Sequence, residues 1–251
     1  MGNNLISRFA LLALAFWTGA AANTQVYAAD ESPVTVLELF TSQGCSSCPP
    51  ADALLGKFAK QDGVLALSMP VNYWDHLGWK DTLAADSFSN RQRFYAENRR
   101  DHEIYTPQIV VNGLLHVVGS RQAAIDEAIE RTGRVLKPAR VAVKISSEGD
   151  SILVRAGVAP ETGKYRSGTL WLALFSRTVK VDIRRGENFG RKIVYTNVVR
   201  NLVPAGRWEG EAVSYRITPP QTPGTDGCAA FLQADSSNAI IGAAVLPAQM
   251  R

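Results

Sequence analysis

Hydrophobic positions in residues 34–134 alternate between short apolar runs and longer segments with helical character. The runs at 34–40 and 64–71 are β-rich and mostly apolar, which is typical of buried central strands. Right-handed crossover connections would make these two strands parallel neighbours. The pattern therefore predicts an α/β domain over residues 30–135. Its expected order is strand, helix, strand, helix, strand, strand, helix, with elements at residues 34–40, 49–60, 64–71, 87–100, 108–113, 114–118 and 120–132.

The pattern changes after about residue 136, where short β-rich runs are separated by turn residues. Val141, Val143 and Ile145 alternate with polar residues, as the residues of half-buried strands do. Further runs occupy residues 152–156, 170–181, 191–199, 211–217, 229–233 and 239–246. Short strands with regular turn signals predict an all-β, sandwich-like C-terminal domain over residues 136–251.

The N-terminus predicts export. Arg8 precedes an apolar run at residues 9–17, and the sequence Val26-Tyr27-Ala28 follows. This order is that of a signal peptide, so residues 1–29 are expected to be removed by cleavage after Ala28 or Ala29. The apolar run is shorter than the about 20 residues that a membrane span needs. We therefore expect a periplasmic or secreted protein with no stable membrane insertion after cleavage.

Charge and cysteine content narrow the range of functions. The chain has 27 Lys and Arg against 23 Asp and Glu, a net charge of +4, and no dense basic run, which disfavours nucleic acid binding. It has three cysteines, and in an oxidising compartment an odd count leaves one thiol without a partner. Cys228 is the odd thiol. A small buried hydrophobic residue is its default interpretation, and a resolving or intermolecular thiol is the alternative.

The C-x-x-C motif Cys45-Ser-Ser-Cys48 lies between a predicted strand and a helix that Pro49 and Pro50 open. Free N–H groups and the dipole at a helix start favour a thiolate at Cys45, which is the attacking species in disulfide exchange. Cys48 would then expel the mixed disulfide. This context favours a redox pair over a metal site or an inert structural disulfide. Zinc needs four ligands and no second C-x-x-C exists, although Cys45, Cys48 and His76 would suit Cu(I).

A second feature is Thr106-Pro107, which precedes the third predicted strand of the same domain. At these residues the chain resembles the thioredoxin superfamily. More narrowly, it is similar to a bacterial family of secreted thioredoxin-like proteins catalogued as a domain of unknown function. The matching segments are residues 38–52, 73–75, 77–79, 105–108, 111–113, 186–188 and 190–191.

The resemblance implies a thioredoxin-like fold and a disulfide-related role. It also implies that Pro107 is cis and faces the cysteine pair, with Thr106 in contact with the thiols. A trans proline at the start of an edge strand is the alternative. A cis proline leaves a backbone edge on which an extended substrate can pair. The dipeptide Ser46-Ser47 has neither the histidine nor the proline of familiar oxidants and reductants, so the resemblance does not give the redox direction.

The loop after the second predicted strand is rich in aromatic residues. In an α/β sheet, function gathers beyond the carboxyl ends of parallel strands, so this loop would flank the cysteines. Trp74, Asp75, His76 and Trp79 would then wall a substrate groove or present polar groups to a ligand. In the alternative, the tryptophans only fasten the loop to the domain and Asp75 caps a turn.

Two acids lie in unusual places. Glu38 is inside an apolar strand and is a candidate proton acceptor for Cys48, with a pKa raised by burial. An ion pair with Arg or Lys, or an exposed edge position, would explain Glu38 equally well. Asp52 is expected to favour the helix start electrostatically.

These residues together predict a periplasmic thiol–disulfide oxidoreductase. Cys45 would attack and Cys48 would resolve, while Pro107 and Thr106 would shape the substrate edge. Its partners would be protein or small-molecule thiols and disulfides, or a redox partner protein, and no cofactor would be required. The alternatives are a Cu(I) metallochaperone that uses Cys45, Cys48 and His76, and a non-enzymatic envelope binding module with a structural disulfide.

Overall fold

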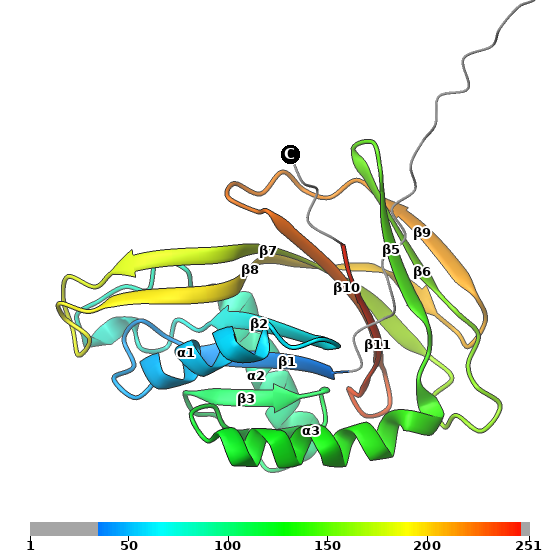
Figure 1. The fold of residues 1–251 in the computed structure, drawn as a ribbon, viewed down its shortest axis with the longest axis horizontal. Helices are drawn as coiled ribbons and strands as arrows, with labels where there is room; N and C mark the ends of the chain where they lie inside the picture. The colour runs from blue at the N-terminus through cyan, green and yellow to red at the C-terminus, as the bar shows by residue number, and fades with distance from the viewer. Residues whose placement is uncertain (1–34, 247–251) are drawn as a thin grey trace, which may run out of the picture.

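The computed structural model describes residues 35–246, so the expected signal peptide at residues 1–29 lies outside the described residues. The fold is mixed α/β, with a large sheet of order β11-β10-β7-β8-β2-β1-β3-β4 and a small sheet of order β5-β6-β9 (Figure 1). In the described part of the chain, no helix is long and apolar enough to cross a membrane. The elements are β1 (Thr35–Thr41), α1 (Pro49–Phe58), β2 (Val64–Pro70), η1 (Asp75–Leu77), α2 (Asp86–Arg99), β3 (Gln108–Val111), β4 (Leu115–Val118), α3 (Gln122–Leu136), η2 (Lys137–Ala139), β5 (Val143–Glu148), β6 (Ser151–Ala156), β7 (Gly168–Asp182), β8 (Lys192–Trp208), β9 (Val213–Ile217), β10 (Gly227–Ala234) and β11 (Ile240–Val245).

The predicted order of elements in the first half is confirmed. β1 and β2 are parallel neighbours, and β3 pairs antiparallel with the other edge of β1. β3 and β4 form the predicted hairpin, which turns at Asn112 and Gly113. Gly113 has φ 70°, and a Cβ there would lie 2.0 Å from the carbonyl oxygen of Asn238 in the β10–β11 turn. A glycine is therefore needed at this turn for both its backbone conformation and its close packing.

The C-terminal strands differ from a free-standing sandwich. β8 pairs parallel with β2 through Ser68 and Val198, so β7, β8, β10 and β11 continue the sheet that β1–β4 begin. Without β8, the outer edge of β2 would present unpaired N–H and C=O groups, which native sheets cover or blunt. Sandwich packing exists only locally, where the small sheet packs on β7, β10 and β11 around a shared core that includes Val143, Val154, Leu172 and Ile241.

The alternation of side chains along β1 separates the two faces of the large sheet. Leu37 and Leu39 point to the face covered by α1 and α3. Val36 and Phe40 point to the opposite face, where α2 packs. Successive strand residues point to opposite faces, so Glu38 must lie on the α2 side and Thr41 on the α1 side. Figure 1 shows α1 and α3 in front of the sheet and α2 behind it.

A two-stranded arm extends from the large sheet. The C-terminal part of β7, residues 178–182, pairs with residues 192–196 of β8, whereas β10 pairs only with β7 residues up to Phe175. We call these paired segments the arm, and the connecting residues 183–191 the arm tip. In Figure 1 the arm runs past β2 toward the end of the molecule that also holds the start of α1.

Glu38 is fully buried in an ion pair, so the proton acceptor role expected for it is not supported. The Arg91 Nε of α2 donates to its Oε1 at 2.6 Å, and the Tyr95 hydroxyl donates to its Oε2. Arg91 also donates to the Gln233 Oε1 of β10 at 3.2 Å. The ion-pair alternative therefore describes Glu38. Its side chain points away from α1 and Cys48, because it lies on the α2 face of the sheet.

Replacement of Arg91 by Leu tests this buried pair. The substitution leaves the Glu38 carboxylate buried without its counter-ion, so the free energy of unfolding should fall by about 3–5 kcal/mol. Urea denaturation at neutral pH measures the change. Arg134→Leu is the control, because it removes an exposed pair with Glu130 and should cost about 0.5 kcal/mol or less. Equal losses in the two variants would contradict the role given to Arg91.

Candidate active site

Cys45 and Cys48 form a disulfide in the turn between β1 and α1. Their Cα atoms are 5.4 Å apart, and the side chains are 3% and 0% exposed. Cys48 occupies the N-cap position of α1, which the prolines at 49 and 50 open as predicted. Cys45 lies three residues before this cap, in a turn closed by the Cys48 N–H donating to the Cys45 carbonyl at 3.2 Å. Both cysteines are buried, and Cys45 precedes the helix rather than standing at its start as expected.

Pro107 reaches the first turn of α1. The Thr106–Pro107 bond is cis, as the resemblance implied. Gly119 lies between Pro107 and Ala51 of α1: an ideal Cβ at Gly119 would be 3.3 Å from the Pro107 Cβ and 3.1 Å from the Ala51 Cβ. The absence of a side chain at Gly119 therefore leaves room for Pro107, just before β3, to lie near α1.

Trp74 and Trp79 fasten the aromatic loop to this site. The indole N–H of Trp74 donates to the Thr106 hydroxyl at 2.8 Å, and the Trp74 Cβ lies 3.1 Å from the position of an ideal Cβ on Gly44. The indole N–H of Trp79 donates to the Gln43 side-chain oxygen at 2.8 Å. Trp74 therefore links the cis-proline strand to the turn before Cys45. Both tryptophans therefore make contacts that fasten the loop to the domain, as the alternative interpretation of this loop expected.

Asp75 and His76 have local roles. Asp75 accepts the backbone N–H of Asp81 at 3.0 Å, and the exposed His76 places its Nδ1 2.9 Å from the Tyr73 carbonyl oxygen. Among residues 35–246, no group of three His, Cys, Asp or Glu side chains is placed to hold a metal ion. The alternative metal site at Cys45, Cys48 and His76 is not assembled in this oxidised structure. Its two sulfurs are bonded to each other, and the His76 ring is engaged in its own turn.

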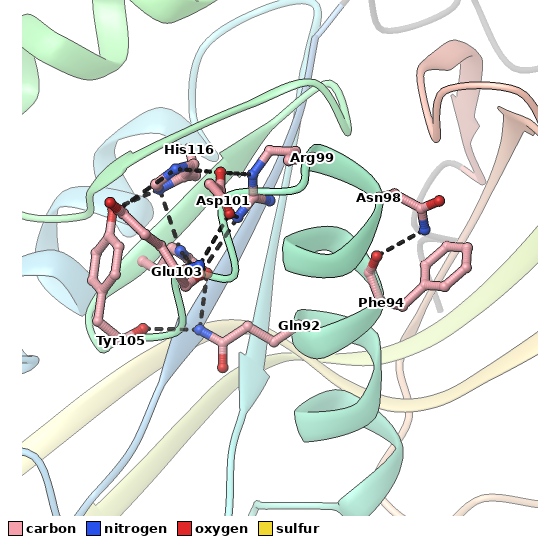
Figure 2. Close-up of polar contacts among 9 residues, drawn as sticks. Gln92, Phe94, Asn98, Arg99, Asp101, Glu103, Tyr105 and His116 are labelled. Atoms are coloured by element: carbon pink, nitrogen blue, oxygen red, sulfur yellow. Dashed lines mark hydrogen bonds and ion pairs between the residues drawn. The ribbon is translucent and has the colours of Figure 1, made fainter.

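A polar network fixes the segment that leads into Thr106 (Figure 2). The Tyr105 hydroxyl lies 2.9 Å from the His116 Nδ1, and the His116 Nε2 lies 3.2 Å from the Asp101 Oδ2. Burial and the nearby Arg99 lower the pKa of His116, so its ring is neutral at pH 7. A neutral ring matches a chain in which Tyr105 donates to Nδ1 and Nε2–H donates to Asp101. Gln92 of α2 adds a bond to the Tyr105 carbonyl at 2.8 Å.

Asp52 is the buried acid on the face of the sheet that carries the cysteines. It lies one helical turn after Cys48 and is 2% exposed, and neither of its carboxyl oxygens has a hydrogen-bond partner among the described residues. Burial raises the pKa of Asp52 to about 8. The carboxyl group is therefore mostly neutral at pH 7, which corrects the expectation that its charge favours the helix start. It lines a cleft of about 700 Å³ between α1 and β8, whose rim includes Lys57, Lys60, Arg191 and Lys192.

Sequence reasoning missed three other residues that hold the motif. Gln43 is buried, and its backbone N–H donates to the Asp81 Oδ2 at 2.8 Å. Burial raises the pKa of Asp81 to about 6, against the effect of its backbone hydrogen bonds. Asn188 in the arm tip donates to the carbonyls of Gln43 and Cys45. The segment 186–188 carried the family resemblance, but the hydrophobic pattern placed it in a separate domain.

Cys228 lies in β10, away from the cysteine pair. It is 8% exposed within the core shared by the small sheet, β7, β10 and β11. Burial raises the pKa of its thiol to about 12. The structure therefore agrees with a small buried hydrophobic residue rather than a reactive thiol.

The fold and site define a mixed α/β protein with a Cys45–Cys48 disulfide at the start of α1 and a cis proline before β3. The chain belongs to a family described as a protein of unknown function, DUF1223, which matches residues 36–233. It is 46% identical over 39 residues to a probable thioredoxin of Archaeoglobus fulgidus, an alignment that covers 16% of this chain and 43% of that protein.

Two solved structures are similar over most of the chain. A crystal structure of an Agrobacterium tumefaciens protein has a TM-score of 0.74 and 31% identity, covering 89% of this chain and 98% of that one. HBP35 of Porphyromonas gingivalis has a TM-score of 0.56 and 14% identity, with coverage of 86% and 76%. The second likeness concerns the fold alone.

The raised pKa of Asp52 predicts a particular dependence of stability on pH. The folded state holds a proton on Asp52 up to about pH 8. The unfolded chain loses this proton near the ordinary aspartate pKa of about 3.9. The folded state therefore binds more protons across this window, and stability falls as pH rises through it. The Asp52→Asn variant removes this term, so its stability relative to the parent should increase by several kcal/mol between pH 4 and pH 8.

Urea denaturation of the oxidised protein at several pH values measures this gain. Asp150→Asn, at an exposed position, is the matched control and should follow the parent at every pH. A constant difference between Asp52→Asn and the parent would show that Asp52 is already ionised in the folded state.

Proposed function

We propose that this protein is an exported thiol–disulfide oxidoreductase whose first half is a thioredoxin-like domain. The observation that carries the proposal is the Cys45–Cys48 disulfide at the start of α1, with the cis Pro107 across Gly119 from Ala51 of that helix. The short match to a probable thioredoxin supports it. The charge and apolar pattern of residues 1–29 supports a periplasmic or secreted location.

The proposed reaction is disulfide exchange between the cysteine pair and a substrate. In the reduced protein, the Cys45 thiolate attacks one sulfur of a substrate disulfide, forms a mixed disulfide and releases one substrate thiolate. The Cys48 thiolate then attacks the Cys45 sulfur, restores the Cys45–Cys48 disulfide and releases the second substrate thiol. Two electrons pass from the pair to the substrate, and the reverse sequence oxidises a substrate dithiol. The Ser47 hydroxyl, 3.4 Å from the Cys45 sulfur, is placed to hydrogen-bond that sulfur.

Asp52 replaces Glu38 as the proposed proton acceptor for Cys48. It lies on the α1 face of the sheet, one turn from Cys48, and its pKa of about 8 is near the ordinary value for a thiol. Proton transfer between two groups of similar pKa has little thermodynamic cost, so Asp52 can accept the Cys48 proton and return it. The adjoining cleft between α1 and β8 gives the carboxyl group a route for proton exchange with solvent.

The proposed partners are proteins or small molecules that carry thiols or disulfides. In the proposed mode, an extended substrate segment pairs with backbone groups of the segment that precedes β3. The reaction as written uses only thiol groups, so we propose no cofactor.

A second candidate function is a binding module with an inert disulfide, which the near-complete burial of both sulfurs favours. The reduction potential separates the two functions. Structural disulfides have potentials below about −300 mV, and redox-active pairs lie at about −120 to −270 mV. Equilibration of the protein with a glutathione redox buffer measures this value.

Covalent trapping tests the role of each cysteine. Cys48→Ser removes the resolving thiol, so mixed disulfides at Cys45 should accumulate in the periplasm and be identified by mass spectrometry. The control carries both Cys45→Ser and Cys48→Ser, which leaves only the buried Cys228 and should trap nothing. Accumulation with Cys45→Ser instead of Cys48→Ser would reverse the assigned roles.

The role of Asp52 predicts a change in one kinetic step. In Asp52→Asn, release of the mixed disulfide by Cys48 should slow by about 100-fold near neutral pH, while attack by Cys45 changes little. Stopped-flow measurement of both steps with a model disulfide separates them. If Asp52 acts as a general base, the release rate of the variant should recover above the pKa of the Cys48 thiol, where the thiol ionises without help. A release rate that is reduced equally at all pH values would contradict this role.

A further inference from the structure

We propose that the arm tip of the C-terminal half is part of the redox site, with Asn188 and Glu187 acting as positioning residues that set the reactivity of Cys45 in opposite directions. This inference rests on the proposed oxidoreductase function. It assigns the C-terminal strands a role in the chemistry in addition to completing the sheet.

The arm tip is an ordered turn that is anchored beside the motif. Residues Ile183 and Arg191 pair at 2.9 Å, and the Gly190 N–H donates to the Ile183 carbonyl at 2.9 Å. Ile183 is buried in a cluster with Leu83, against which Trp79 packs. Gly186 has φ 73°, and a Cβ there would lie 3.1 Å from the Trp79 Cβ. The tip is therefore held against the same aromatic loop that fastens Gln43.

Asn188 holds the backbone just before and just after Cys45. It is 0% exposed, and its Nδ2 donates to the Gln43 carbonyl at 2.9 Å and to the Cys45 carbonyl at 2.8 Å. These two bonds engage the partial negative charges of two carbonyl groups next to Cys45. Without Asn188, the Gln43 carbonyl would lose this donor, and the Cys45 carbonyl would keep only the Cys48 N–H beside a developing thiolate. Asn188 should therefore favour the thiolate form of Cys45.

Glu187 binds the N–H of the peptide group whose carbonyl Asn188 binds. Its Oε2 accepts the backbone N–H of Ser46 at 3.3 Å, and its side chain lies at the surface. The N–H groups that follow Cys45 are the donors available to a thiolate before the first turn of α1. Glu187 engages one of them, the Ser46 N–H, and so brings a negative charge to the peptide group that follows Cys45. It should therefore disfavour the thiolate, and its effect should weaken as salt is added.

As a consequence, the acidity of the Cys45 thiol is set by Glu187 and Asn188, which both belong to the C-terminal half of the chain. The fraction of Cys45 present as thiolate controls the rate of its attack on a disulfide, and the stability of that thiolate contributes to the redox equilibrium of the pair. No additional redox step is involved, since the same two electrons pass between the cysteine pair and the substrate.

The experiment measures the pKa of Cys45 in a Cys48→Ala, Cys228→Ala background, from the pH dependence of alkylation by iodoacetamide. Glu187→Gln should lower this pKa by about half a unit at low salt, and Asn188→Ala should raise it by about the same amount. A loosened turn would shift both variants in one direction, so opposite shifts distinguish electrostatic control from a merely structural role.

Two matched controls accompany these variants. Glu211→Gln removes an exposed negative charge from the β8–β9 turn and should leave the Cys45 pKa unchanged. Asn197→Gly removes another asparagine that donates to a backbone carbonyl, that of Ala66 at 2.9 Å, and its φ of 47° suits glycine. This variant should lose stability without a change at Cys45.

The outcomes separate this inference from the proposed function. If Asn188→Ala does not fold, the surface variant Glu187→Gln and its salt dependence decide the inference alone. Unchanged or same-direction shifts in folded variants would overturn the role of the arm tip, provided that the reduced parent still exchanges with oxidised glutathione. Failure of the reduced parent to exchange would overturn the proposed function itself.

Discussion

The parallel pairing of β8 with β2 is the constraint on which the rest of the structure depends. It converts two groups of strands into one eight-stranded sheet and covers the edge that β2 would otherwise expose. Because β8 continues past this junction into the arm, the same pairing directs residues 183–191 toward the turn that holds Cys45. A single strand register therefore both completes the core and brings the two halves together at the cysteine pair.

The large sheet also separates two buried acids, of which one is ion-paired and the other is protonated near neutral pH. Glu38 lies on the α2 face and remains paired with Arg91 and Tyr95, which joins β1, α2 and β10 in one network. Asp52 lies on the α1 face without a hydrogen-bond partner in the described part of the chain, and burial keeps it protonated near neutral pH. A paired carboxylate stabilises the core, whereas an unpaired carboxyl group of raised pKa is suited to exchange a proton with a thiol.

Three segments converge on the disulfide, and each fixes a different side of it. The strand after the cis bond approaches α1 at Gly119, the aromatic loop reaches Gln43 and Thr106 through its tryptophans, and the arm tip binds the backbone through Asn188. Ser46 and Ser47 are the exposed residues between the two cysteines. Selectivity in this site would then come from the fixed surroundings of the pair as much as from the pair itself.

The sequence by itself determined the local features, because each depends on neighbouring residues. The cysteine pair before a helix opened by prolines, the parallel β1 and β2, and the turn at Asn112-Gly113 follow from short-range pattern, and the cis Pro107 followed from a resemblance carried by adjacent residues. The tertiary structure decided what depends on distant partners. Asn188 meets Cys45 across 143 residues, Glu38 pairs with Arg91 of α2, and β8 joins β2 instead of closing a separate sandwich. Periodicity specifies which face of an element is buried, but only packing specifies what that face meets.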